Sequence, residues 1–407
     1  MTPDRNRREK ILQRVSQLVE TKFFDPDFDS AKWQAEVAAR RDDILDSADS
    51  VAFEQAVHDL LQTLGKSHTA FFHRNLRPVP SRQAICATLN TCETPDGPRL
   101  MFADVQEEGP AQLAGIEPGD LLLSINGEPI DPSKPPHFRV GSSVCLGIAK
   151  GNGHNAEVRF EIPNPKSRQP FTLPKPVVHR TLPGSVGYLK VNIFPGLVGI
   201  DVARDIDHAI ASLQDCRRLI VDLRGNSGGG LGALRLMSYL TADRRPIGYS
   251  LTRARAQRGY DKERLVRFVA IPSSKWQLPL LALRYAFRDH SIVLVTEGLG
   301  PRPFHGRIAI LVNQHSASAA EMIAAFAQEN GLARIVGVKT PGRLVGSRPF
   351  KLPDGYVVIL PVGAYLTWSG QTLEGKGVQP DAGVELSYET VSAGQDPQLD
   401  NALRLLE

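Results

Sequence analysis

The chain has 407 residues, of which 42% are hydrophobic and 23% are charged. These values are typical of a folded protein with two or three domains and exclude a disordered chain. The 48 basic and 44 acidic residues give a net charge of +4, which is too balanced to indicate a nucleic-acid-binding protein.

No segment of the sequence indicates export or insertion into a membrane. The N-terminal segment MTPDRNRREKILQRV is charged and polar, without the apolar core of a signal peptide. No later segment has enough uninterrupted apolar residues to cross a bilayer. The cysteines (Cys86, Cys92, Cys145 and Cys216) form no CxxC pair and no His/Cys metal cluster. We therefore expect a cytoplasmic protein with reduced thiols and no metal.

The pattern of residues changes three times along the chain. Residues 1–82 are mainly helical, and AFEQAVHDLLQTLG places apolar residues on one helical face, with Gly65 as its stop. Residues 83–164 are strand-like, with Gly, Pro and Asn turns. After the proline-rich link PNPKSRQPFTLPKP, residues 165–384 alternate strands with helices, and residues 385–407 form a tail with a short amphipathic helix. The sequence predicts a multidomain α/β protein.

A candidate nucleophile follows the apolar segment RIAILVN, which is suited to a buried strand. The next residues, QHSASAAEMIAAFAQENG, predict a turn and then a helix. Ser316 or Ser318 therefore lies near the positive end of a helix dipole, where the negative charge that develops on an attacked carbonyl is stabilised. Serine is also a common N-cap, so the motif alone leaves both roles open.

A second strand, in RLIVDLRGNSGGG, leads into a glycine-rich loop that precedes a helix near Leu231. Glycines let backbone N–H groups approach a reacting group closely. The loop lacks the lysine and Ser/Thr of a P-loop and the GxGxxG spacing of a dinucleotide site. An oxyanion hole fits this loop better than a nucleotide site.

Five motifs occur in the order DLRGNSGG, LVNQHSASAAE, RIVGVKTPGR, LPDG and EGKGVQPD. Together they resemble the serine peptidase family of C-terminal-processing (tail-specific) and tricorn-type proteases. EEGPAQLAGIEPGDLLLSINGEPI resembles the second half of a PDZ domain, and LLQTLGKSHTAFF resembles the N-terminal helical region of the family. The resemblance extends from about residue 10 to 384. It implies a crotonase-like α/β protease core with an N-terminal helical subdomain and an inserted PDZ-like β-rich domain.

By this resemblance, Ser318 is the nucleophile. The oxyanion hole is formed by the amide of Ala319 with that of Gly228 or, as second choice, Gly229. Ser316 is left as a structural or capping residue.

The chain departs from the C-terminal-processing pattern at the general base. Those members use a lysine in a segment resembling VGxKTxGK, and the corresponding residue here is Arg343. An arginine stays protonated and cannot accept the serine proton, so Arg343 is instead a candidate for binding a substrate carboxylate or a neighbouring acidic residue. Lys339 lies four residues earlier but matches a different position of the family.

Tricorn-type members resemble the chain in a Ser-His pair, here Ser67 and His68, and in a glutamate, here Glu374. The resemblance implies that His68 takes the proton of Ser318 and later returns it to the leaving amine. Ser67 and Glu374 would orient the imidazole and stabilise its charged form.

The expected activity is hydrolysis of peptides or of protein C-terminal regions through an acyl-enzyme, without metal or organic cofactor. The PDZ-like segment either captures peptides or serves as a scaffold. Residues 252–305 match no motif and are a possible insertion that narrows the cleft. A homo-oligomer is possible. The alternatives are a non-catalytic binding protein on the same fold, a Ser-Lys protease using Lys339, and an acyl-CoA enzyme of the related crotonase fold.

Overall fold

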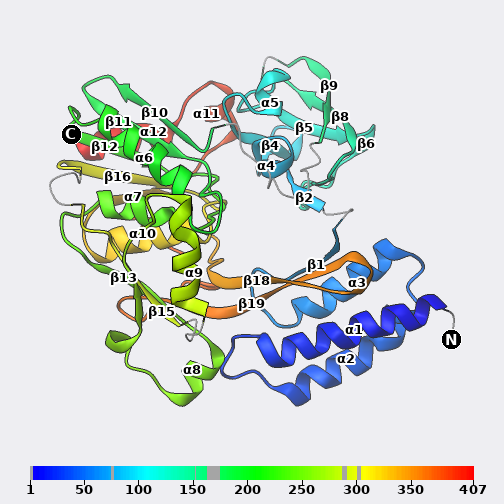
Figure 1. Cartoon of the computed structure of the whole chain (residues 1–407). Helices are drawn as coiled ribbons and strands as arrows, with labels where there is room; N and C mark the ends of the chain where they lie inside the picture. Colours follow the sequence, from blue (N-terminus) through cyan, green and yellow to red (C-terminus); the bar gives the residue numbers. More distant parts are fainter. Residues whose placement is uncertain (1–2, 75–77, 152, 163–174, 287–290, 300–303) are drawn as a thin grey trace. The chain divides into compact units, whose positions relative to one another are not determined.

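A computed structural model describes residues 3–74, 78–151, 153–162, 175–286, 291–299 and 304–407 (Figure 1). Most of the proline-rich link (163–174), together with 287–290 and 300–303 of the possible insertion, lies outside the described residues. The chain divides into two compact units. The first unit comprises Met1–Arg77, Arg244–Thr296 and Gly342–Gly377, and the second comprises Pro78–Asp243, Glu297–Pro341 and Val378–Glu407.

In the first unit, three N-terminal helices lie beside a six-stranded sheet of order β1-β19-β13-β15-β14, in which β18 also pairs with β19 (Figure 1). The helices are α1 (Pro3–Lys22), α2 (Ser30–Leu45), α3 (Ser50–Gln62), α8 (Arg253–Arg258) and α9 (Leu278–Ala286), with short 3-10 turns at Lys262–Arg264, Lys275–Gln277 and Pro353–Gly355. The strands are β1 (Ala70–His73), β13 (Pro246–Leu251), β14 (Val266–Phe268), β15 (Ile292–Val295), β18 (Val345–Lys351) and β19 (Tyr356–Thr367).

The helix predicted before Gly65 is α3. Its N-cap Asp49 accepts the Ala52 N–H, and its apolar face is buried in a cluster with residues of α1, α2, β1, β18 and β19. Gly65, three residues past the end of the helix, has φ +63°, a conformation that glycine adopts without strain. The same cluster therefore fixes the chain entering β1, which follows residues 67 and 68.

The stretch 252–305 contributes β14 and β15 to the sheet of the first unit. β15 pairs with both β13 and β14, so the described residues of this stretch up to Thr296 belong to the first unit, whereas those from Glu297 onward belong to the second.

The second unit contains a five-stranded antiparallel path β3-β4-β5-β8-β9, with β6 paired to β5, in the region predicted to be PDZ-like. Its strands are β3 (Ala87–Thr94), β4 (Gly97–Val105), β5 (Leu121–Ile125), β6 (Glu128–Pro129), β8 (Ser143–Ala149) and β9 (Asn155–Glu161). The helices α4 (Ser81–Ala84) and α5 (Pro110–Leu113) and the small pair β2 (Pro78–Pro80) and β7 (His137–Arg139) accompany them.

A second sheet of this unit has the order β10-β11-β12-β16-β17-β20, parallel from β11 to β20. Its strands are β10 (Val177–Leu182), β11 (Val186–Val191), β12 (Arg218–Asp222), β16 (Arg307–Val312), β17 (Arg334–Gly337) and β20 (Ala382–Gly383). The helices are α6 (Ile200–Ser212), α7 (Ala233–Tyr239), α10 (Ala319–Glu329), α11 (Tyr388–Ser392) and α12 (Pro397–Leu406). Residues 219–222 and 308–312 are buried, as expected for central parallel strands.

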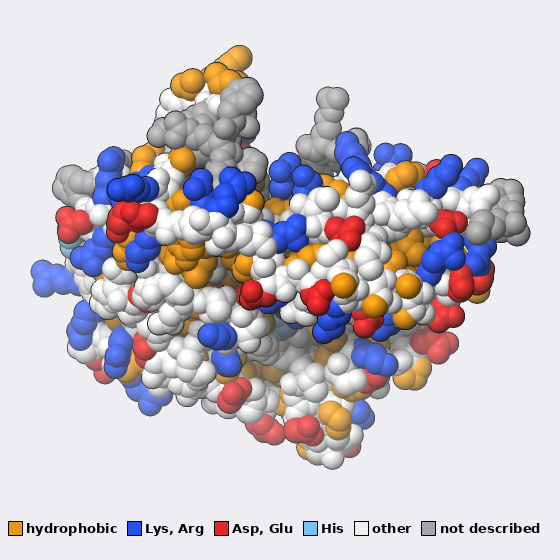
Figure 2. Space-filling view, turned by 90° about the horizontal axis from the view of Figure 1, so that it is seen from below, with side chains coloured by type: hydrophobic (Ala, Val, Ile, Leu, Met, Phe, Trp, Pro, Cys, Tyr) orange, Lys and Arg blue, Asp and Glu red, His pale blue; other side chains and the backbone are white. Residues whose placement is uncertain are grey.

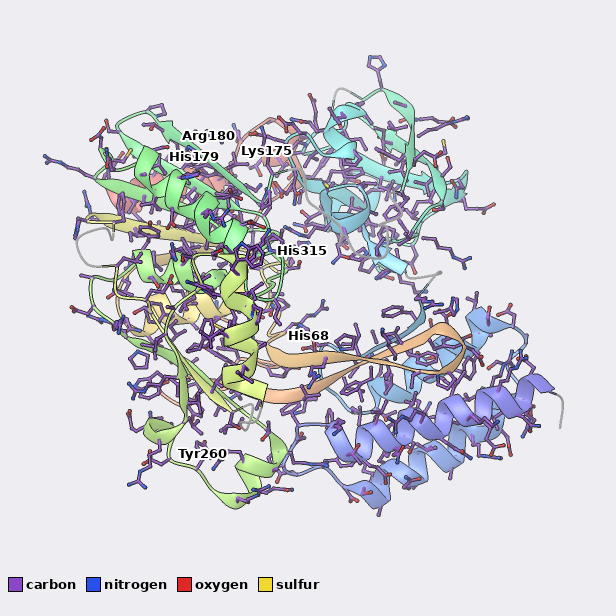
Figure 3. All side chains as sticks on the ribbon, in the orientation of Figure 1. His68, Lys175, His179, Arg180, Tyr260 and His315 are labelled. Atoms are coloured by element: carbon purple, nitrogen blue, oxygen red, sulfur yellow. The ribbon has the colours of Figure 1, made fainter. Side chains whose placement is uncertain are left out.

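Polar contacts join the two sheets of the second unit. Lys190 on β11 forms an ion pair with Asp104 on β4, and the His315 ring contacts the Asn90 side chain on β3 at 2.6 Å. His315 and the basic residues of β10 are labelled in Figure 3. The PDZ-like region is therefore anchored to β11 and to the turn that follows β16.

On the face shown in Figure 2, Lys and Arg side chains are interspersed with Asp and Glu side chains, which agrees with the balanced composition. Among the helices that the structure describes, none is both long and apolar enough to cross a bilayer.

Candidate active site

The turn after β16 gives Ser318 an unusual backbone. Ser318 is the N-cap of α10, with φ 56° and ψ −116°, a region that side-chain-bearing residues rarely adopt. Such a conformation costs on the order of 1–3 kcal/mol and persists only where the surroundings impose it. Ser318 is partly exposed, as a nucleophile that meets substrate must be.

The glycine loop after β12 lies directly against this turn. A Cβ atom on Gly228 would stand 2.6 Å from the Ser318 Cβ and 2.9 Å from the Ala319 nitrogen. Gly228 also has φ +90°. Only glycine permits this approach, so the loop is built to bring its backbone to Ser318.

Three hydrogen bonds join the turn to the loop. The Ala317 N–H donates to the Asn226 carbonyl (2.8 Å), and the Gly225 N–H donates to Asn313 Oδ1 (2.9 Å). The Ser316 hydroxyl donates to the Leu223 carbonyl (2.8 Å) and is fully buried. Ser316 therefore stabilises the turn, and its proton is already used.

The hydrogen bonds distinguish the two glycines predicted as oxyanion donors. The Gly228 N–H donates to Asn226 Oδ1 at 2.7 Å, and Asn226 is itself buried. The N–H groups of Gly229 and Ala319 have no hydrogen-bond partner among the described residues. Gly229, the second choice from the sequence, is therefore the better candidate to act with Ala319, because its amide is available.

In the first unit, Ser67, His68 and Glu374 form a connected group, here called the base cluster; Figure 3 labels His68. The Ser67 hydroxyl donates to Glu374 Oε2 (2.9 Å), and the Ser67 N–H donates to Glu374 Oε1 (2.6 Å). The Leu344 N–H also donates to Glu374 Oε2 (2.9 Å). His68 Nδ1 lies 2.8 Å from Ser67 Oγ. Glu374 thus holds Ser67, and Ser67 holds the imidazole.

These contacts determine the tautomer of His68. A hydroxyl has one proton, and that of Ser67 is donated to a carboxylate. In the contact between Ser67 and His68, Nδ1–H must therefore be the donor. The neutral imidazole then carries its free lone pair on Nε2, where a general base needs it.

The surroundings favour the neutral form of this ring. Burial lowers the pKa of His68 below its usual value of 6.5; the Glu374 carboxylate partly opposes this shift, and the Arg343 guanidinium adds to it. His68 is therefore ready to accept a proton at neutral pH.

The two cations considered for other roles are both solvent-exposed. Lys339 lies just after β17 in the second unit, and Arg343 lies just before β18 in the first unit. The pKa of His68 responds to Arg343, so this residue acts on the base cluster.

Comparison with known proteins identifies the family. Residues 185–384 match peptidase family S41, and residues 101–139 match the PDZ domain. Residues 185–384 therefore belong to peptidase family S41. The chain is accordingly a serine peptidase with a PDZ domain in an α/β fold.

The similar proteins include both C-terminal-processing and tricorn-type proteases. The chain is 25% identical to the carboxyl-terminal-processing protease of Synechocystis sp. over 86% of this chain and 76% of that one. It is 24% identical to tricorn protease homolog 1 of Streptomyces coelicolor, over 97% of this chain and 35% of that one. Among solved structures, mature CPAF complexed with lactacystin has a TM-score of 0.61 at 15% identity, covering 98% of this chain and 97% of that one. The S41 peptidase thus shares its fold with proteins of very different sequence.

Sequence reasoning missed three contributors to the site: the Asn226 side chain, the Leu344 amide and Glu321. Glu321, which is fully buried, accepts the Ser318 N–H at 3.0 Å. The spacing S-x-x-E at the start of the helix is a capping-box pattern and could have indicated Glu321. The contacts of Asn226 and Leu344 depend on residues far apart in the chain, and no local pattern predicts them.

The charge effects on His68 can be tested by titration. Arg343→Gln removes a cation that disfavours imidazolium, so the pKa of His68 should rise; Glu374→Gln should lower it. A base is active above its pKa, so the acid limb of activity should move to higher pH in Arg343→Gln and to lower pH in Glu374→Gln. NMR titration of the His68 ring measures these shifts. Arg348→Gln, an exposed arginine of β18, is the control and should leave the pKa unchanged. A fall in pKa in Arg343→Gln would contradict the electrostatic account.

The close approach of the glycine loop gives a second prediction. In Gly228→Ala, the new Cβ collides with Ser318 and the Ala317 carbonyl, so the turn must shift. Displacements of about 1 Å cost on the order of 100-fold in rate, and we expect at least that loss in labelling of Ser318 by a fluorophosphonate. Gly383→Ala, where a Cβ meets nothing within 4 Å, is the matched control. Labelling of Gly228→Ala at the wild-type rate would show that the approach is unimportant.

Proposed function

We propose that this S41 peptidase hydrolyses peptide bonds through an acyl-enzyme on Ser318, with His68 as general base and Ser67 and Glu374 as its orienting partners. The contact of the Ser67 hydroxyl with the Glu374 carboxylate supports this role for His68, because a hydroxyl has a single proton to donate. Its donation to Glu374 leaves Nε2 of His68 as the basic nitrogen.

The reaction proceeds in two halves. Ser318 Oγ attacks the scissile carbonyl while its proton passes to His68 Nε2, and the oxyanion receives hydrogen bonds from the Gly229 and Ala319 amides. The tetrahedral intermediate collapses as imidazolium donates its proton to the leaving amine. Water, deprotonated by His68, then attacks the ester and releases the second product with Ser318 restored.

The other readings of the sequence fit less well. A Ser-Lys mechanism would depend on Lys339, which is exposed, because Arg343 occupies the lysine position of the C-terminal-processing pattern. A non-catalytic carrier would have no need for the strained Ser318 backbone or the Gly228 approach. The family match extends across both the nucleophile and the glycine loop, which further favours the enzyme.

We infer that the substrates are peptides or the C-terminal regions of proteins, as the name of the Synechocystis relative suggests for that protein. The cytoplasmic location predicted from the sequence is also part of the proposal. In support, all four cysteines carry free thiols. Cell fractionation tests it, and recovery of the protein outside the cytoplasmic fraction would exclude it.

The catalytic assignment is tested by mass spectrometry after treatment with a serine-directed fluorophosphonate. Wild type should gain one adduct, on Ser318, and Ser318→Ala should gain none. In His68→Ala the labelling rate should fall by about 10²- to 10⁴-fold, because an unassisted hydroxyl is a weak nucleophile. Cleavage of reduced, alkylated casein by the same proteins tests peptide hydrolysis.

His73→Ala, another histidine of the first unit, is the matched control and should label normally. If His68→Ala labels as fast as wild type, the base is another group and Lys339→Met becomes the next variant. If wild type shows no adduct, the proposed acyl-enzyme mechanism fails.

A further inference from the structure

A buried carboxylate beside the nucleophile has no place in the tetrad. Glu321, in the first turn of α10, is 0% exposed. Its Oε2 accepts the Ser318 N–H at 3.0 Å, and its Oε1 accepts the Thr340 hydroxyl at 2.7 Å. Burial of a carboxylate costs free energy unless both of its oxygens accept hydrogen bonds. The two contacts of Glu321 meet this condition, which points to a specific role for its carboxylate beside Ser318.

Thr340 is in turn fixed by the neighbouring segment. It is 2% exposed, its hydroxyl accepts the Val378 N–H at 2.7 Å, and its own N–H donates to the Val378 carbonyl at 3.1 Å. The hydroxyl proton is therefore directed at Glu321. A line of hydrogen bonds runs from Val378 through Thr340 and Glu321 to the backbone of Ser318.

Thr340 and Val378, at one end of this chain of hydrogen bonds, lie next to the boundaries of the second unit in the sequence. The chain leaves the second unit after Pro341 and returns to it at Val378. Within the first unit the same two segments are also paired, because the Gly375 N–H donates to the Gly342 carbonyl and the Leu344 N–H donates to Glu374.

We propose that Glu321, oriented by Thr340, is a positioning residue for the nucleophile, an inference that rests on the proposed function of Ser318. Its carboxylate holds the N–H of Ser318 and so maintains φ 56° at a residue that would otherwise relax. With the Ser318 amide occupied, the next amide of the helix, that of Ala319, stays directed at the oxyanion position.

The pair of contacts requires a carboxylate. A carboxylate accepts at both oxygens, whereas an amide presents a donor in place of one of them. Glu321→Gln therefore loses or reverses one contact at nearly constant volume. Thr340→Val removes the hydroxyl at similar size, and Thr340→Ser retains it.

The test measures fluorophosphonate labelling over a range of probe concentrations in the full chain. In Glu321→Gln the maximal labelling rate should fall about 10- to 100-fold with a half-saturating concentration within about threefold of wild type. Thr340→Val should show the same kind of loss, and Thr340→Ser should restore it. The double variant should be little slower than Glu321→Gln, since Thr340 acts through the carboxylate. If Glu321 and Thr340 only stabilised the fold, the folded variants would keep the maximal labelling rate of wild type. Thr340→Ser would then have no lost rate to restore.

Thermal melts show that each variant is folded at the assay temperature. If folded Glu321→Gln labels at the wild-type rate, the inference is overturned; if Glu321→Gln does not fold, Thr340→Val decides, and a wild-type rate there overturns it. If wild type itself is not labelled at Ser318, the proposed function fails and this inference fails with it. The two failures are therefore distinguishable.

Discussion

The parallel pairing of β12 with β16 is the constraint on which the Ser318 side of the proposed site depends. The register runs from Arg218 opposite Arg307 to Asp222 opposite Leu311, so both strands end at one edge of the sheet. The segments that leave this edge are the glycine loop and the Ser318 turn, which are about 90 residues apart in the chain. Their buried backbone groups must find partners, and Asn226, Asn313 and Ser316 supply them. The rigidity that holds Ser318 is thus a consequence of satisfying buried polar groups.

In the base cluster, the Glu374 carboxylate is connected to the His68 imidazole through the Ser67 hydroxyl, which contacts both groups. Glu374 accepts three hydrogen bonds, two from Ser67 and one from Leu344, which fix its position. Its charge therefore raises the pKa of His68 less than burial lowers it. The arrangement orients the ring without converting it into a permanent cation, which suits a group that must accept a proton and then return it.

The sequence predicted the central strands and the turn and helix around Ser318 because these are local patterns. Apolar segments such as RLIVD and RIAILV correspond to buried parallel strands, and Ser318 follows one of them directly. It did not predict that three separated segments form the first unit, since the pairing of β1 with β19 joins residues nearly 290 apart and leaves no periodic trace. It also did not predict that the Gly228 N–H donates to Asn226 Oδ1. The occupancy of the Gly228 amide depends on how the Asn226 side chain folds back, which composition and spacing do not encode.

A carboxylate beside a centre where negative charge develops should, by itself, oppose the reaction. The position of Glu321 limits this effect, because Glu321 lies in the first turn of α10, at the positive end of the helix dipole. Glu321 takes the Ser318 amide and the Thr340 hydroxyl, and the Ala319 amide is left for the oxyanion. One helix terminus can therefore serve two anions through different donors. The negative charge of Glu321 weakens the stabilisation of the oxyanion, but its hydrogen bond fixes the backbone of the proposed nucleophile Ser318. The second effect is the larger one where a displacement of about 1 Å costs on the order of 100-fold in rate.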